Sequence, residues 1–148
     1  MTQGERLALF SEKVRQSSLK RFRIVKVQDR AYRPASGRLS FVDHLKHLVD
    51  CDRWILAVVC GDAEPHADIH PGEGDIALWD SYMLVLEQSG LEKANYLRGL
   101  SSLDLDRIIE KPENLGRPDV GSLILRENLD HEIHHRRMVQ LLLKLKYS

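Results

Sequence analysis

Four long stretches of this chain repeat apolar residues every three or four positions, and this pattern limits the possible folds more than any other feature of the sequence. Such spacing places the apolar side chains on one face of an α-helix. We predict helices at about residues 4–28, 40–60, 76–100 and 119–146, with a short extra helix at 103–109. No stretch has the apolar–polar alternation typical of a half-buried strand. The sequence therefore predicts an all-α four-helix bundle.

The length of the chain and its turn residues fit one such bundle. A chain of 148 residues can bury a sizeable core, and we expect residues 1–148 to form one domain. Polar crossings with several Pro and Gly residues lie before the third helix and before the last, at 61–74 and 111–118. His66 and His70 fall in the first crossing, where we expect both to be exposed.

The charge balance and the N-terminus limit the partners and the location. Lys and Arg total 22, as do Asp and Glu, so the net charge gives no reason to expect nucleic acid as the main partner. No run approaches the ~20 apolar residues that a membrane span needs. The N-terminus lacks the basic start and apolar core of a signal peptide. We therefore expect a cytoplasmic protein that binds neither nucleic acid nor membrane. Its cysteines, Cys51 and Cys60, fall on opposite sides of one helix and cannot form a disulfide there.

Two histidines of the predicted last helix, His131 and His135, form the first candidate site. They are four residues apart, so they lie one turn apart on the same face of the helix. At about 100° per residue, they share a stripe with the apolar residues Ile124, Met138 and Leu142. Burying an unpartnered polar group costs roughly 1–3 kcal/mol. The pair therefore needs partners, and the spacing leaves open whether these are one shared metal ion or separate carboxylates and backbone carbonyls.

The predicted second helix carries two more histidines, His44 and His47. Its start is marked by Ser40, with Asp43 three residues later, which resembles a capping box. Both histidines lie on or beside the apolar face of this helix. Periodicity alone does not choose between them as partners of the pair on the last helix, and it slightly favours His44.

Two stretches that contain these histidines resemble signatures of the DinB-like superfamily. The first is residues 40–50, S-F-V-D-H-L-K-H-L-V-D, and the second is residues 130–136, D-H-E-I-H-H-R. The helix lengths and the spacing between the two stretches are also similar to those of the family, so the resemblance covers essentially the whole chain. There is one departure. After the last histidine the family often continues Arg-Gly-Gln, whereas here His135 is followed by Arg136-Arg137-Met138.

The resemblance implies an up-down-down-up path for the four helices and one divalent metal ion held by His47, His131 and His135. It places the first ligand in a Leu-x-His-Leu context, which occurs here at residues 45–48 and favours His47 over His44. Three neutral imidazoles suit zinc or nickel, and also iron or copper, and three protein ligands leave a position open to a substrate. The implied function is that of a metal-dependent hydrolase or a low-molecular-weight-thiol transferase acting on a small molecule.

Other residues near the histidines are candidates for a supporting role. Glu127 lies one turn before His131 and could act as a general base or accept the second ring N–H of a ligand histidine. Further candidate acceptors are Asp43, Asp50 and Asp130. Cys51, one turn from His47, is either a metal ligand or contact thiol, or simply a small buried hydrophobic residue.

Two other functions remain open on the sequence alone. The chain could be a non-catalytic bundle that binds a metal or a small ligand, for example in a stress response, or an interaction module whose histidines are structural. The last helix also carries an apolar strip on the side away from the histidines, formed by Leu125, Leu129 and Ile133. This strip predicts burial by another helix or subunit, and hence a homodimer.

Overall fold

The fold is an all-α bundle, as predicted. The structure is a computed structural model that describes residues 1–62 and 68–148. Its helices are α1 (Gln3–Ile24), α2 (Phe41–Val59), α3 (Trp79–Arg98), α4 (Ser102–Asp106), α5 (Val120–Ile124) and α6 (Asp130–Tyr147). A π-helical turn, Leu125–Leu129, joins α5 to α6, so residues 120–147 form one continuous last helix. Within the described residues there is no strand, and only Ile108 and Asp119 form an isolated bridge.

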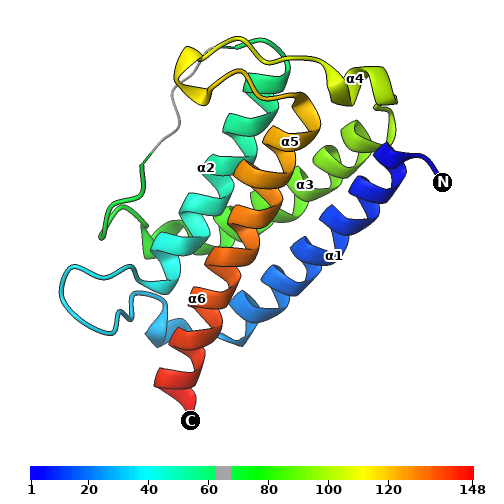
Figure 1. The fold of residues 1–148 in the computed structure, drawn as a ribbon. Coiled ribbons are helices and arrows are strands. Elements are labelled where there is room, and N and C mark those ends of the chain that lie inside the picture. The colour runs from blue at the N-terminus through cyan, green and yellow to red at the C-terminus, as the bar shows by residue number, and fades with distance from the viewer. Residues whose placement is uncertain (63–67) are drawn as a thin grey trace.

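The four long helices follow the expected path. In Figure 1, α1 and the last helix run in one direction, while α2 and α3 run in the other, which gives the up-down-down-up order. Helix α1 packs against α3 and α6, and α2 packs against the same two helices. Helices α1 and α2 therefore occupy opposite corners of the bundle, and α2 lies beside α6. Among the described residues, no helix combines the length and the apolar character that crossing a membrane requires.

Asp43 fixes both the start of α2 and the end of the crossing that leads to α3. The predicted capping box is present, because Ser40 Oγ accepts from the Asp43 backbone N–H at 3.2 Å and the Asp43 carboxylate accepts from the Ser40 N–H at 2.9 Å. The same carboxylate accepts from the N–H groups of Gly72 and Gly74 at 3.1 and 2.8 Å. A Cβ at Gly74 would lie 2.5 Å from the Val42 carbonyl group, so only glycine allows this approach. Burial raises the pKa of Asp43, but these N–H donors outweigh that effect and hold the pKa below its ordinary value.

The core consists of two apolar clusters with a polar layer between them. The cluster nearer α4 and α5 includes Trp54, Ile55, Leu97, Leu123, Ile124 and Leu129. The cluster at the opposite end includes Phe22, Phe41, Leu45, Trp79, Leu86 and Val139. Between the clusters, each long helix contributes one buried charged side chain: Arg15 of α1, Asp52 of α2, Lys93 of α3 and Glu132 of α6, each at most 4% exposed. We call these four residues the charged layer.

The charged layer is closely paired. Arg15 donates to both carboxylate oxygens of Glu132, at 3.0 and 2.7 Å, and forms an ion pair with Asp52 at 2.8 Å across the bundle. Lys93 donates to Asp52 at 2.8 Å and to the side-chain carbonyl of Asn128, in the π-helical turn, at 2.7 Å. Two positive and two negative charges thus satisfy one another. Burial raises the pKa of Asp52, but Lys93 and Arg15 outweigh it and the pKa falls below its ordinary value.

The buried face of the last helix differs from the predicted one, because it includes a member of the charged layer. Met138, expected to face inward, is 39% exposed, and Leu129, expected on the outer side, is fully buried. The inward face instead contains Asn128, Glu132 and His135. Polar residues occupy the positions that a hydropathy pattern would assign to solvent, because their partners come from the three other helices. Since Leu129 is covered by the chain's own core, it no longer supports the predicted homodimer, which stays a prediction.

Candidate metal centre

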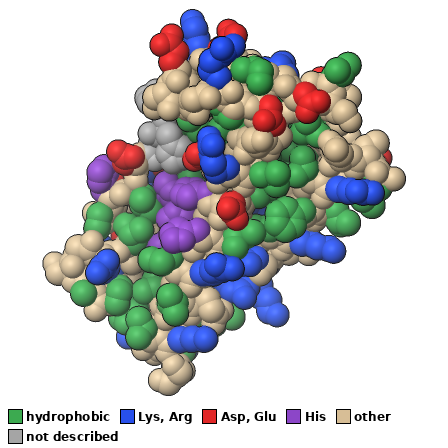
Figure 2. Space-filling model, viewed as in Figure 1, with side chains coloured by type: hydrophobic (Ala, Val, Ile, Leu, Met, Phe, Trp, Pro, Cys, Tyr) green, Lys and Arg blue, Asp and Glu red, His purple; other side chains and the backbone are tan. Residues whose placement is uncertain are grey.

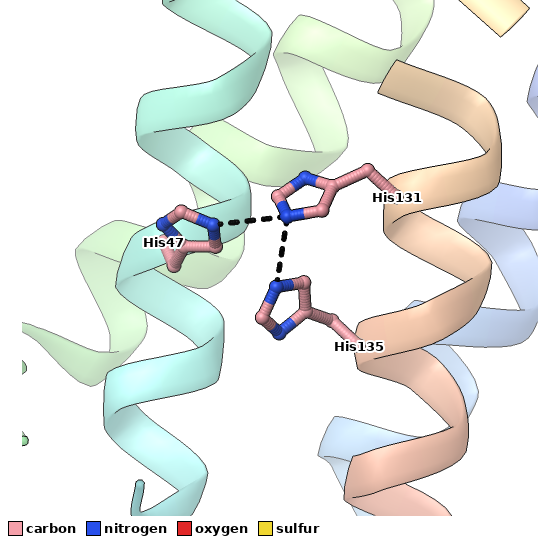
Figure 3. A group of neighbouring side chains, drawn as sticks. All are labelled: His47, His131 and His135. Carbon is pink, nitrogen blue, oxygen red and sulfur yellow. Dashed lines mark hydrogen bonds between the residues drawn. The ribbon is translucent and has the colours of Figure 1, made fainter. Parts of the chain in front are cut away.

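Three imidazole rings from two helices converge beside the charged layer. His47 projects from α2, and His131 and His135 project from α6 toward it, as Figure 3 shows. The Nε2 atom of His131 is 3.3 Å from Nε2 of His47 and 3.0 Å from Nε2 of His135. One ligand atom from each of the three residues lies within 4.8 Å of the others. The structure therefore brings together the three histidines that the family resemblance named.

The spacing of these nitrogens fits a shared metal ion. Two nitrogens bound to one zinc ion at about 2.0–2.1 Å are about 3.3 Å apart at a tetrahedral angle and about 2.9 Å apart at a right angle. The two separations that involve His131, 3.3 and 3.0 Å, match this range, and His47 and His135 have ligand nitrogens within 4.8 Å of each other. Two neutral imidazole lone pairs repel each other at such distances unless a proton or a cation lies between them. The donor set is thus suited to a divalent ion.

His44 lies behind this group and contacts His135 from the other side. The Nδ1 atoms of His44 and His135 are 2.9 Å apart. When His135 directs the lone pair of Nε2 toward the other two rings, its proton is on Nδ1, and His44 Nδ1 accepts it. His44 is 1% exposed, so its ring is held in place by the core. The structure thus gives the two histidines of α2 different positions: His47 joins the converging rings, and His44 orients one of them.

Burial keeps the two inner histidines neutral near pH 7. Burial, together with the neighbouring imidazoles, His44 first among them, lowers the pKa of His135 to about 2. Burial also lowers the pKa of His44 to about 4, which the Asp43 carboxylate only partly opposes. A neutral imidazole is the form that binds a metal ion, so the environment favours the ligand state.

Cys51 forms part of the wall around the histidines. Its Sγ atom is 3.4 Å from His47 Nε2 and 3.5 Å from His131 Nδ1, and the residue is 5% exposed. Burial, together with the nearby Asp52 charge, raises the pKa of the Cys51 thiol to about 12. At neutral pH the side chain is therefore a thiol whose sulfur can accept from the Nδ1–H of His131. Cys60, the other cysteine, is exposed at the end of α2.

Of the carboxylates that the sequence suggested as partners of the histidines, three bond to groups other than the three converging rings. Glu127 accepts from Arg126 Nε at 3.0 Å and is partly exposed, and Asp50 pairs with Lys46 at 2.6 Å. Asp43 holds the cap of α2, and Asp130 is exposed. The buried carboxylates whose charges act on Cys51 at this site include Asp52 and Glu132, neither of which periodicity suggested.

The histidines outside the converging group differ in exposure. His134 and His70 are exposed, and His66 lies outside the described residues. In the view of Figure 2, histidine side chains form a patch at the surface over the region where α2 and α6 lie side by side. Of the converging residues, His131 is partly exposed, while His47 and His135 are each only 5% exposed.

The comparisons with known proteins agree with this arrangement. A family model described as the DinB superfamily matches residues 11–139. The match begins within α1 and ends within α6, so it covers at least part of each long helix and all of both histidine-containing stretches. No curated protein matches the chain significantly.

Proposed function

The chain belongs to the DinB superfamily, and from this premise we propose that it is a metal-dependent enzyme that acts on a small molecule. His47, His131 and His135 hold one divalent ion, zinc or nickel. The observation that carries the proposal is the convergence of three imidazole nitrogens, from two helices, at separations of 3.3 and 3.0 Å. The reaction class is hydrolysis or the transfer of a low-molecular-weight thiol.

The residues of the chain prepare this site in three ways. A divalent ion held by three neutral imidazoles supplies a Lewis acid with a position open to a small molecule. His44 fixes the tautomer of His135 through the contact of 2.9 Å between their Nδ1 atoms. Cys51 lines the site with its Sγ 3.4 Å from His47 Nε2, and in the metal-free protein its pKa is raised to about 12, so it is a neutral thiol there. Three neutral imidazole ligands would leave the full charge of the ion available to a bound anion or polarised group.

A non-catalytic metal-binding bundle is the second candidate. The observation that favours it is the pairing of Glu127 with Arg126, because Glu127 was the one side chain that the sequence suggested as a general base. A site without a prepared base can hold an ion without turning over a substrate.

Metal content is the first test of the proposal. Protein purified without a histidine tag should contain, or take up, one equivalent of zinc or nickel, measured by elemental analysis and calorimetric titration. His47→Ala and His131→Ala should each remove this binding. His134→Ala is the matched control, because His134 lies on the same helix but is exposed, and it should bind one equivalent as before. Stoichiometric metal in all three variants would contradict the three-histidine site.

Turnover distinguishes the two candidate functions. A screen of activated esters, and of thiols paired with electrophiles, should give metal-dependent turnover that disappears in His131→Ala. One bound equivalent without turnover on any substrate of the screen would favour the non-catalytic bundle.

A further inference from the structure

A groove with a volume of about 350 Å³ lies between α1 and α6, on the other side of α6 from α2. It is lined by Arg21, Arg136, Arg137, Gln140 and Leu141. Three of its five lining residues are arginines, and Leu141 gives it an apolar side. The groove is separate from the histidines, because none of them lines it.

Arg21 is held in one orientation at this groove. Its Nε donates to the side-chain carbonyl of Gln140 at 3.0 Å. One of its terminal nitrogens donates to the backbone carbonyl and the hydroxyl of Ser17, at 3.0 and 2.6 Å. All these acceptors are neutral, so they position the guanidinium without cancelling its charge. Preorganised guanidinium groups bind planar oxyanions through paired hydrogen bonds.

The arginines of the groove, Arg21, Arg136 and Arg137, form no ion pair within residues 1–62 and 68–148, which the structure describes. Arg136 is partly buried and lines the same groove as Arg21 and Arg137. Like charges brought together and partly desolvated repel each other, so an anion placed among them would be stabilised.

The spacing along α6 places two arginines beside its contact with α1. Arg136 and Gln140 are four residues apart, on one face of α6, and Gln140 contacts Arg21 of α1. Arg137 directly follows Arg136 and also lines the groove. The packing of α1 on α6 therefore brings three arginines to one groove.

We propose that the groove between α1 and α6 binds an oxyanion, the carboxylate or phosphate group of a small anionic molecule. Arg21, Arg136 and Arg137 donate to its oxygens, and Leu141 contacts the apolar part of the molecule. This site goes beyond the proposed metal-dependent activity and does not depend on it.

Anion titration of the metal-free protein tests the site. Inorganic phosphate and succinate are added at constant ionic strength, and the arginine Nε–H signals are followed by NMR. We expect saturable shifts of the Arg21, Arg136 and Arg137 signals with at least one anion. Tighter binding of phosphate or of succinate identifies which oxyanion the groove prefers. No saturable shift with either anion would overturn the proposal.

Two variants distinguish specific binding in the groove from nonspecific electrostatic attraction of anions. Arg137→Gln should weaken binding about tenfold, the loss expected for one charged hydrogen-bond donor pair. Arg126→Gln is the matched control, because it removes an arginine of the same continuous helix that is exposed and paired with Glu127. It should leave the affinity unchanged. Equal weakening in both variants would show that only the overall charge matters and would refute the site. Unfolding curves of both variants confirm that the measured losses concern folded protein.

Discussion

Replacing Glu132 by glutamine should cost this protein a large part of its stability. The Glu132 carboxylate accepts three hydrogen bonds, two from Arg15 and one from Ser18 at 2.8 Å, and it is 2% exposed. Glutamine keeps the volume but removes the charge, and its amide nitrogen would face a donor of Arg15 or Ser18. Breaking a buried ion pair on one side costs about 3–5 kcal/mol. We therefore expect Glu132→Gln to lower the free energy of unfolding by about 4 kcal/mol. This is a large part of the total, since natural domains are stable by only about 5–15 kcal/mol.

Urea unfolding of the metal-free protein, followed by far-UV circular dichroism, measures this effect. Glu127→Gln is the matched control, since Glu127 lies five residues earlier in the same continuous helix but pairs with Arg126 near the surface. It should change the free energy of unfolding by less than about 1 kcal/mol. Replacing Arg15 and Glu132 together by methionine should lower the free energy of unfolding less than Glu132→Gln alone does. In the double variant Asp52 and Lys93 still pair with each other, so no buried charge is left without a partner. Equal effects of Glu132→Gln and Glu127→Gln would refute the role of the charged layer.

Three further outcomes follow from the candidate metal centre. His44→Ala should weaken zinc binding about 10–100-fold in a competition titration with a chelating dye, and His44→Gln, which keeps an acceptor, should recover part of the loss. The pKa of His44 in the folded protein, about 4, lies below the ordinary value of 6.5, so the unfolded chain binds more protons as the pH falls. The free energy of unfolding of the metal-free protein should therefore fall between pH 6.5 and 5, by about 2 kcal/mol from this group alone, and pH-independent urea curves in this interval would contradict it. Iodoacetamide should modify exposed Cys60 but not Cys51 in the native protein, because burial raises the pKa of Cys51 to about 12. Peptide mapping by mass spectrometry checks this, and equal labelling of both thiols would show that Cys51 is accessible.

The sequence was sufficient for the helices and for their boundaries within a few residues. Local signals carry this information, because the capping box of Ser40 with Asp43 and the cap at Asp119 both depend on residues three apart. The short helix likewise begins at Ser101 through a capping box with Asp104. The π-helical turn before Asp130 was not predicted, since no composition distinguishes it from an ordinary helical turn.

The buried polar residues could not be read from the pattern. Arg15, Asp52, Lys93 and Glu132 look like solvent-facing residues in any one helix, and only the packing of all four helices shows that they pair. The same limit explains the choice of Glu127, whose position was extrapolated at a constant 100° per residue from a stripe centred on His131. In the structure the stripe is centred nearer Glu132, and His131 lies at its edge with partial exposure.

The sequence predicted the positions of three of the histidines at the site but not that of His44. Their spacing predicted that His131 and His135 would share a side of the last helix, and the resemblance selected His47; the structure brings these three together. Spacing could not decide whether His44 or His47 is the ligand. The two residues lie within one turn on the same side of α2, so periodicity does not distinguish a ligand from a residue that contacts a ligand. The distinction depends on the direction of the rings, which only the packing of α2 against α6 determines.

The charged layer also has a consequence for how this sequence can change over time. Its four members come from four helices, so a single replacement at any of them strands a partner that remains in the interior. Tolerated substitutions at these positions should arise as linked sets, in which a cation and its anion are exchanged or lost together, and a helix transplanted from a relative should succeed only if its matching residues are transplanted too.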